Sequence, residues 1–358
     1  MTVRVLALTV AICCTAALHA QKENPYRKVD NDVRLAAIRH AQVWLPGDIG
    51  AKNLRIGPQD GSGFQPEAVI TCDYVEAKQV GTPKFDCALS PQDIIRIKFG
   101  QENGEIYSEV AASRLLWALG FGADRVYPVK VVCRGCPEDP MQAFKKVDGT
   151  REFGYAVAER KLAGDQMELR KDSGWAWVEL SFVDQTSGGA PLAHRDALKL
   201  LAAMIQHTDT KPEQQRLICL DRAHGRTAAE DGACGNAFML INDLGKTFGR
   251  ATMTNADNKS AVNFEAWSST PVWKDEEACV AQLSKSFTGS LEHPKISEDG
   301  RKFLSGLLSQ LTDRQLQDLF EVARFTTREP NVPIDAWVGA FREKRDAIAN
   351  ASCANPIL

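Results

Sequence analysis

The sequence predicts an α+β fold in which a β-rich first part precedes a mainly helical second part. Two segments with β-branched residues and partial alternation, residues 68–75 and 94–99, indicate strands in the first part. Apolar residues recur at helical spacing from residue 303 onward, which indicates helices in the second part. The composition changes near residues 161–165, so we place the crossover there. Such an arrangement predicts two lobes with a cleft where they meet.

The first part begins with a turn-rich connection and continues as strands around one helix. Glycine and proline gather in residues 57–63, before the first strand. Residues 107–119 are predicted to form a helix, with Gly120 and Gly122 as candidates for its C-cap. This helix is apolar on more than one side, which indicates burial between layers. Residues 126–132 and 155–161 are the remaining predicted strands.

The second part opens with a strong predicted helix at residues 194–205, which leads directly into a polar loop. Residues 237–241 form a short buried strand. Ser297 has the sequence of a helix start, and Thr312 with Gln315 makes a capping box. The C-terminal region is therefore predicted to be mostly helical.

Composition places the chain among ordinary globular proteins. Its 358 residues are enough for one large domain or two lobes with a substantial core. The hydrophobic fraction is 44% and the charged fraction is 25%, both of them ordinary values. The formal net charge is -3, and the chain has no dense run of lysine and arginine. A general affinity for nucleic acid is therefore not expected.

The N-terminus has the layout of a secretory signal peptide. Arg4 precedes an apolar run at residues 5–18, and the small residue Ala20 stands before the polar Gln21. The run is too short to span a membrane comfortably as a helix, and no later segment approaches a membrane span. We therefore expect residues 1–20 to be cleaved. The mature protein would be exported, periplasmic or secreted, with no transmembrane segment.

Eight cysteines remain once the predicted signal peptide is removed. An even number of cysteines in an exported protein predicts disulfides, although the sequence does not fix their connectivity. The CxxC spacing at Cys133 and Cys136 also fits a redox motif or half of a zinc site, but no second CxxC accompanies it. Pairing of neighbours along the chain would give Cys72–Cys87, Cys133–Cys136, Cys219–Cys234 and Cys279–Cys353.

Two motifs in the second part contain the residue types that phosphoryl transfer needs. Residues 207–214 read HTDTKPEQ, and residues 243–245 read DLG directly after a predicted strand. The first motif resembles the catalytic loop of protein kinases, and the second resembles their magnesium-binding Asp-Phe-Gly motif. The resemblance covers most of the mature chain in the order of its elements, while motif identity is confined to short segments.

The resemblance implies a role for four residues of these motifs. Asp209 would orient the proton of the acceptor hydroxyl, and Lys211 would contact the transferred phosphate. Asp243 would be a ligand of Mg²⁺ or Mn²⁺, because hard cations prefer oxygen ligands. Gln214 stands where the family has the asparagine that binds the second metal ion, and its amide oxygen can still coordinate.

The resemblance also implies an ATP-binding region in the first part. Lys98, on a predicted strand, would contact the α- and β-phosphates, and Glu109 on the following helix would pair with it. Glu105, nearer the start of that helix, is the competing partner. Gly61 and Gly63 would belong to a loop that covers the phosphates, although their spacing differs from GxGxxG.

Taken together, the resemblance implies a disulfide-stabilised, two-lobed protein-kinase-like fold. Residues 21–162 would form the β-rich N-lobe and residues 163–358 the helical C-lobe. The implied function is that of a secreted atypical kinase, which transfers the γ-phosphate of ATP to a hydroxyl of a protein, a lipid head group or a sugar. The alternative is a catalytically inactive kinase fold that acts outside the cytoplasm as a binding or scaffolding module, because Gln214 weakens the second metal position.

Overall fold

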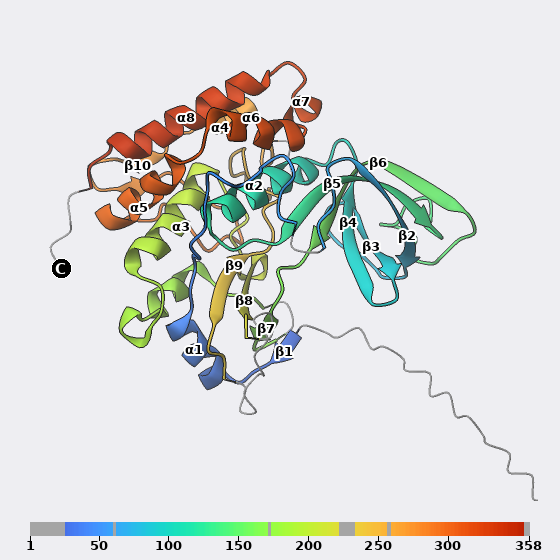
Figure 1. Ribbon diagram of the computed structural model, residues 1–358, viewed down its shortest axis with the longest axis horizontal. Coiled ribbons are helices and arrows are strands. Elements are labelled where there is room, and N and C mark those ends of the chain that lie inside the picture. The colour runs from blue at the N-terminus through green and yellow to red at the C-terminus, as the bar shows by residue number, and fades with distance from the viewer. Residues whose placement is uncertain (1–25, 60–61, 171–172, 222–232, 256–258, 354–358) are drawn as a thin grey trace, which may run out of the picture.

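The computed structural model describes residues 26–59, 62–170, 173–221, 233–255 and 259–353 (Figure 1). The predicted signal peptide, residues 1–20, lies outside these ranges. The described residues form a mixed α/β structure with a closed barrel of strands at one end and a mainly helical part at the other. None of the helices in these ranges is both long and apolar enough to cross a membrane.

Five strands close the barrel in the order β2–β3–β4–β6–β5. Neighbouring strands are antiparallel, except that β2 and β5 pair in parallel. β2, β4, β5 and β6 confirm the predicted strands. β3 is not predicted, because its alternation of polar and apolar residues extends only over residues 84–87. The bounds are β2 (Ala68–Val75), β3 (Lys84–Ser90), β4 (Asp93–Phe99), β5 (Arg125–Arg134) and β6 (Thr150–Arg160).

Aromatic side chains fill the interior of the barrel. Tyr74 and Phe85 are buried there, and Phe85 packs against Phe153 with 4.9 Å between the ring centroids. Ile97 on β4 and Val129 on β5 are also fully buried. The barrel thus has a hydrophobic core of its own, distinct from the larger core of the rest of the molecule.

Four disulfides join the cysteines as pairing of chain neighbours predicts. Cys133 and Cys136 are bonded to each other and buried, which does not fit a zinc site. On the loop-entropy model a loop of 15 residues contributes roughly 3 kcal/mol, and longer loops contribute more. The pairs are Cys72–Cys87, Cys133–Cys136, Cys219–Cys234 and Cys279–Cys353.

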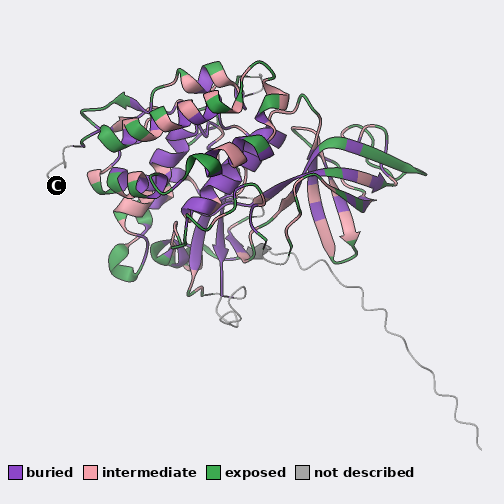
Figure 2. Ribbon diagram, turned by 45° about the horizontal axis from the view of Figure 1, so that its top comes forward, coloured by how far each residue is buried: buried purple, intermediate pink, exposed green. Residues whose placement is uncertain are grey.

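Helix α2 (Glu105–Leu119) lies between the barrel and the helical part (Figure 2). All of its residues except Trp117 are buried, as its apolar residues on several sides predict. The helix ends at Gly120, whose φ of 88° is the left-handed conformation that favours glycine at this position. Of the two predicted C-cap candidates, Gly120 is therefore the one that ends the helix.

A second sheet lies in the helical part, with the strand order β1–β7–β8–β9. β1 and helix α1 (Asn31–His40) precede the barrel in sequence, yet β1 pairs in parallel with β7, and α1 contacts β9. The chain therefore starts at this sheet, builds the barrel and returns (Figure 1). The bounds are β1 (Tyr26–Lys28), β7 (Asp165–Glu168), β8 (Gln215–Cys219) and β9 (Ala237–Ile241).

Helix α3 (Leu192–Met204) packs against α5 (Glu298–Leu308) in the centre of the helical part. Ser297 and Thr312 cap α5 and α6 with their side chains, and Gln315 completes the predicted capping box. The other elements are short 3-10 helices at 177–182, 185–187 and 212–214, α4 (Phe264–Ser268), β10 (Trp273–Asp275), β11 (Val280–Ala281), α6 (Asp313–Val322), α7 (Phe325–Arg328) and α8 (Ile334–Asn350).

Candidate active site

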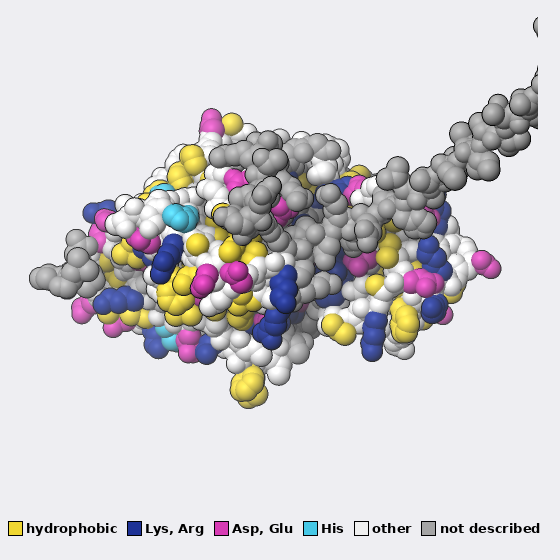
Figure 3. Space-filling view, turned by 90° about the horizontal axis from the view of Figure 1, so that it is seen from below, with side chains coloured by type: hydrophobic (Ala, Val, Ile, Leu, Met, Phe, Trp, Pro, Cys, Tyr) yellow, Lys and Arg dark blue, Asp and Glu magenta, His cyan; other side chains and the backbone are white. Residues whose placement is uncertain are grey.

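One cleft of about 1320 Å³ is lined by residues of both the barrel and the helical part. The charged side chains among its described lining residues are eight cationic and six acidic ones, so the lining favours an anionic ligand. On the outer face shown in Figure 3, by contrast, Lys and Arg are interspersed with Asp and Glu. The charged lining residues are Lys84, Arg96, Lys98, Arg160, Lys161, Lys211, Arg216, Lys246, Asp86, Glu105, Glu159, Asp209, Glu213 and Asp243.

Lys98 is buried on β4 and forms an ion pair with Glu109 on α2, as predicted from the sequence. Its Nζ also lies 3.5 Å from Glu105 Oε2 and 3.6 Å from Asp243 Oδ2. Burial by itself would lower the pKa of Lys98, but the carboxylates of Asp243, Glu109 and Glu105 raise it well above its ordinary value. The lysine is therefore a fixed ammonium at the floor of the cleft.

Asp243 stands at the end of the buried strand β9, where the chain turns into the cleft. Its Oδ1 accepts a hydrogen bond of 3.0 Å from the backbone N–H of Gly245. Burial opposes ionisation, but the Lys98 ammonium and the Gly245 N–H hold the pKa of Asp243 well below its usual range. Its side chain is therefore a carboxylate that can accept a cation.

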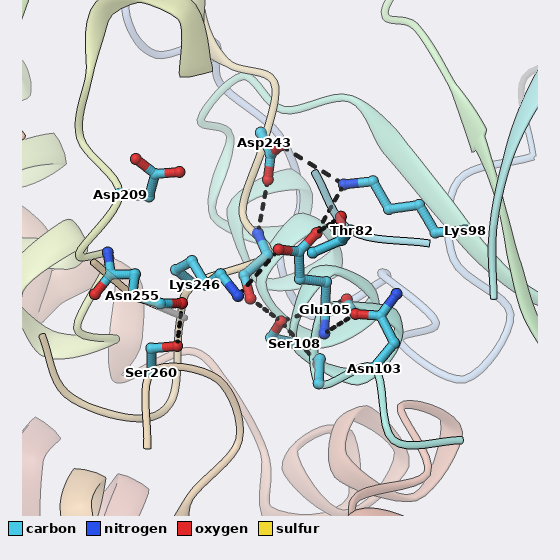
Figure 4. Close-up of polar contacts among 12 residues, drawn as sticks. Thr82, Lys98, Asn103, Glu105, Ser108, Asp209, Asp243, Lys246, Asn255 and Ser260 are labelled. Atoms are coloured by element: carbon cyan, nitrogen blue, oxygen red, sulfur yellow. Dashed lines mark hydrogen bonds and ion pairs between the residues drawn. The ribbon is translucent and has the colours of Figure 1, made fainter. Parts of the chain in front are cut away.

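Asp209 lies in the loop between α3 and β8. Its side chain lines the same cleft as that of Asp243 (Figure 4). Lys211 Nζ approaches Asp209 Oδ2 to 3.1 Å, and Gln214 Nε2 donates to the same oxygen at 2.7 Å. The loop is tied to the segment at residues 290–291, because Thr210 Oγ1 accepts hydrogen bonds from the backbone N–H groups of Ser290 and Leu291.

His207 opens this loop but does not face the cleft. Its ring is fully buried near Trp177, with 6.3 Å between the ring centroids. Neither ring nitrogen has a hydrogen-bond partner among the described residues, and burial lowers the pKa of His207 to about 4. It is therefore a neutral packing residue under the loop.

The oxygen atoms at this end of the cleft fit a hard divalent cation such as Mg²⁺ or Mn²⁺. Asp243 supplies an ionised carboxylate, and Asn242 beside it has a buried side-chain oxygen with no partner among the described residues. Carboxylate oxygens of Glu105, Glu109 and Asp243 also lie within 4.8 Å of one another, but these three groups already surround the Lys98 ammonium. Gln214, the other predicted ligand, lines the cleft, and its amide nitrogen faces Asp209.

The predicted glycine loop is only partly described. Gly61 lies outside the described residues, and Gly63 stands near Ser62, which does line the cleft. The connection between β2 and β3 also lines the cleft, through residues 80–83. Sequence reasoning misses this connection because it misses β3, although Gly81 and Pro83 are a turn signal.

Two further residues of the cleft are not assigned a role from the sequence. Thr82 Oγ1 donates a hydrogen bond of 2.8 Å to Glu105 Oε2, and Lys246 Nζ lies 3.1 Å from Glu105 Oε1. Glu105, the competitor of Glu109 for Lys98, is thus a partner of Lys98 as well as of these two residues. Lys246 follows the DLG motif directly, which is the one sequence signal that could have found it.

Comparison with known proteins gives a distant likeness to solved structures. No protein-family model matches the chain, and no curated protein matches it. Among solved structures, the crystal structure of a Helicobacter pylori proinflammatory kinase, CtkA, matches with a TM-score of 0.42 and 8% sequence identity. The match covers 80% of this chain and 95% of that chain. A likeness of this size carries no conclusion about the activity of the present chain.

Proposed function

We propose that this chain is an atypical, kinase-like phosphotransferase that transfers the γ-phosphate of ATP to a hydroxyl acceptor. The observation that carries the proposal is the meeting of four separate segments in one cleft. These are β4 with Lys98, α2 with Glu105, the loop with Asp209 and Lys211, and the turn with Asp243. Glu109, one turn further along α2, is the buried partner of Lys98 behind this lining. Phosphoryl transfer depends mainly on the positioning of such charges, so a cleft with this set of charges suits it.

Each residue has a defined part in the proposed reaction. The acceptor oxygen forms a bond to the γ-phosphorus, the bond from that phosphorus to the β–γ bridging oxygen breaks, and ADP leaves. Asp209 orients the acceptor hydroxyl and receives its proton, while Lys211 contacts the transferred group. Lys98 contacts the α- and β-phosphates. A Mg²⁺ or Mn²⁺ ion held by Asp243, with Gln214 and Asn242 beside it, would supply charge neutralisation on the phosphates.

We place this activity outside the cytoplasm. The four disulfides support the placement, because such bonds persist in oxidising compartments and are rare in the cytosol. The predicted signal peptide at residues 1–20 supports it independently. The acceptor belongs to one of three classes, namely a protein, a lipid head group or a sugar.

A second candidate function is an inactive kinase-like module that binds nucleotide without turnover. One contact favours it: Gln214 Nε2 donates a hydrogen bond to Asp209 Oδ2, so the residue at the predicted second metal position contacts the predicted proton acceptor. A nucleotide-bound module with a single metal ion could serve as a binding or scaffolding unit.

Thermal unfolding and phosphate transfer together test the proposal. The oxidised protein from residue 21 onward is unfolded with and without ATP and Mg²⁺ or Mn²⁺, beside Asp243→Asn. Ligand at one hundred times its dissociation constant should stabilise the wild-type fold by about 2.7 kcal/mol and the variant by much less.

Transfer from γ-labelled ATP to protein, lipid and sugar acceptors is then measured for wild type and Asp209→Asn. Turnover that Asp209→Asn abolishes supports the kinase. Metal-dependent nucleotide binding without turnover of any acceptor supports the inactive module. If no nucleotide and metal combination stabilises the wild-type protein, both candidate functions are wrong.

A further inference from the structure

Glu105 connects three parts of the cleft through one buried carboxylate. Its Oε2 accepts the hydrogen bond of Thr82 from the β2–β3 connection and lies 3.5 Å from Lys98 Nζ. Its Oε1 lies 3.1 Å from Lys246 Nζ. Figure 4 shows the side chains of Lys98 and Lys246 reaching Glu105 from different sides. The side chain of Glu105 is 8% exposed, so solvent screens these contacts little.

The close approach of Glu105 depends on the glycine of the DLG turn. A Cβ atom at Gly245 would lie 2.7 Å from Glu105 Cγ, so a side chain at this position would displace the carboxylate. The same turn is tied to α2 by Ser108, whose hydroxyl donates to the carbonyl oxygen of Gly245 at 2.6 Å. The start of α2 and the residues after Asp243 therefore form one fixed unit.

Lys246 is anchored to the loop that contains Asp209. Its carbonyl oxygen accepts hydrogen bonds from the backbone N–H of Thr208 at 3.0 Å and from the Thr208 hydroxyl at 3.4 Å. Thr208 immediately precedes Asp209. The backbone of Lys246 is thus fixed relative to both Asp209 and Asp243, and its side chain lines the cleft.

The two lysines differ in how many carboxylates hold them. Lys98 has Glu109, Glu105 and Asp243 as partners, whereas the described ion pair of Lys246 is with Glu105. Among the described residues, an entering anion competes with one carboxylate for Lys246, and Lys98 already shares that carboxylate. Charge-assisted hydrogen bonds between an ammonium and phosphate oxygens are among the strong ones in proteins.

We propose that Lys246 is a third phosphate-binding lysine of the cleft, besides Lys98 and Lys211, and that Glu105 is the positioning residue that holds its ammonium until a polyphosphate chain takes over the contact. The ligand class is the polyphosphate chain of a nucleoside triphosphate, which inorganic tripolyphosphate shares. The identification of this polyphosphate chain as that of ATP rests on the proposed function. The anion site itself does not.

Isothermal titration of the oxidised protein from residue 21 onward tests the assignment with three probes: Mg²⁺–ATP, tripolyphosphate and adenosine. Lys246→Met should weaken the binding of the two phosphate-containing probes about tenfold, because it removes one charge-assisted contact. Its affinity for adenosine should equal that of wild type. Lys246→Arg, which keeps the charge, should restore most of the loss. Lys295→Met is the matched control, because Lys295 is exposed and does not line the cleft.

Glu105→Gln separates positioning from a purely structural role. The amide oxygen can still accept the hydrogen bond from Thr82, but the negative charge that competes with phosphate is gone. Affinity for tripolyphosphate should therefore rise in Glu105→Gln and fall in Lys246→Met. If the two variants weaken binding equally, Glu105 does not compete with the anion and the proposal is overturned.

The outcomes also distinguish this inference from the proposed function. Equal affinity of Lys246→Met and wild type for both phosphate probes overturns the inference and leaves ATP binding intact. Binding of tripolyphosphate through Lys246 without binding of ATP supports the anion site and sinks the proposed function. If the wild-type protein binds neither probe, both are wrong. If Lys246→Met does not fold, Lys246→Arg and Glu105→Gln carry the test, because both keep the packing.

Discussion

The two walls of the cleft hold their charges in different ways. On the barrel wall, the side chains of Lys98 and Glu109 are each 3% exposed and belong to a network of one ammonium and three carboxylates. On the opposite loop wall, the side chain of Lys211 is 35% exposed and that of Asp209 is 16% exposed. The buried network is inseparable from the packing of α2 against β4, whereas the loop contacts are local.

This difference teaches which residues can be tested by substitution without loss of the fold. A buried ion pair that loses one partner leaves an uncompensated charge at high cost, while a half-exposed pair contributes little. We therefore expect substitutions on the barrel wall to affect stability first. Substitutions on the loop wall should affect function first.

The largest expected effect is that of Lys98→Met. It leaves Glu109, Glu105 and Asp243 close together without their shared ammonium, and we expect a loss of roughly 3–5 kcal/mol in the free energy of unfolding at pH 7. Denaturant unfolding measures this loss. The double variant Lys98→Met/Glu109→Leu should recover part of it, because an apolar pair replaces the ion pair.

Lys130→Met is the matched control for that measurement. Lys130 is exposed on β5, and its substitution should change the free energy of unfolding by less than about 0.5 kcal/mol. A loss below 1 kcal/mol in Lys98→Met would contradict the view that the buried network is part of the packing.

His207 should have an intermediate effect on the free energy of unfolding. It is an exception to the contrast between the two walls, because it is fully buried although it lies beneath the loop wall. Burial lowers the pKa of His207 from about 6.5 in the unfolded chain to about 4. The stability that the neutral ring contributes is fully present above pH 6.5 and is lost as the pH falls toward 4. The loss should be roughly 2–3 kcal/mol.

The difference in unfolding free energy between wild type and His207→Leu, measured from pH 4 to pH 7.5, checks this expectation. The variant should lack the part of the acid destabilisation that His207 causes, so the free energy of unfolding of wild type should fall relative to that of the variant as the pH falls. Parallel curves would mean that His207 titrates alike in the folded and unfolded chains.

The smallest effect on stability is expected on the loop wall itself. Lys211→Met and Asp209→Asn should each change the free energy of unfolding by less than about 1 kcal/mol, because their ion pair is partly exposed. Phosphate transfer by Asp209→Asn should nevertheless fall about 100-fold or more, since it removes the group that takes the proton. A loss of fold in Asp209→Asn would break the contrast between the walls.

The parts of the site that local patterns specify are predictable from the sequence. HTDTKPEQ and DLG lie where a helix and a buried strand end, and both elements are confirmed. The pair of Lys98 with Glu109 follows from a strand and the helix after it. The disulfides also follow chain order, although the sequence alone leaves their pairing open.

Contacts that depend on how distant segments pack are not predictable in the same way. Glu105 and Glu109 stand one turn apart on the same side of α2, so the sequence offers a choice between them, whereas both contact Lys98 in the fold. Lys246 meets Glu105 only because the DLG turn packs against the start of α2. The β2–β3 connection is missed because β3 has interrupted alternation.

The placement of β1 has a consequence for the order in which the chain can fold. Tyr26 pairs with Gln166 across the whole length of the barrel sequence, so the strand that is synthesised first acquires its neighbour only after the barrel strands exist. Such non-local pairing is slow, and an unpaired strand is open to wrong partners in the meantime. For a chain that emerges N-terminus first, we expect the barrel to assemble early as an independent nucleus and the N-terminal strand to dock late.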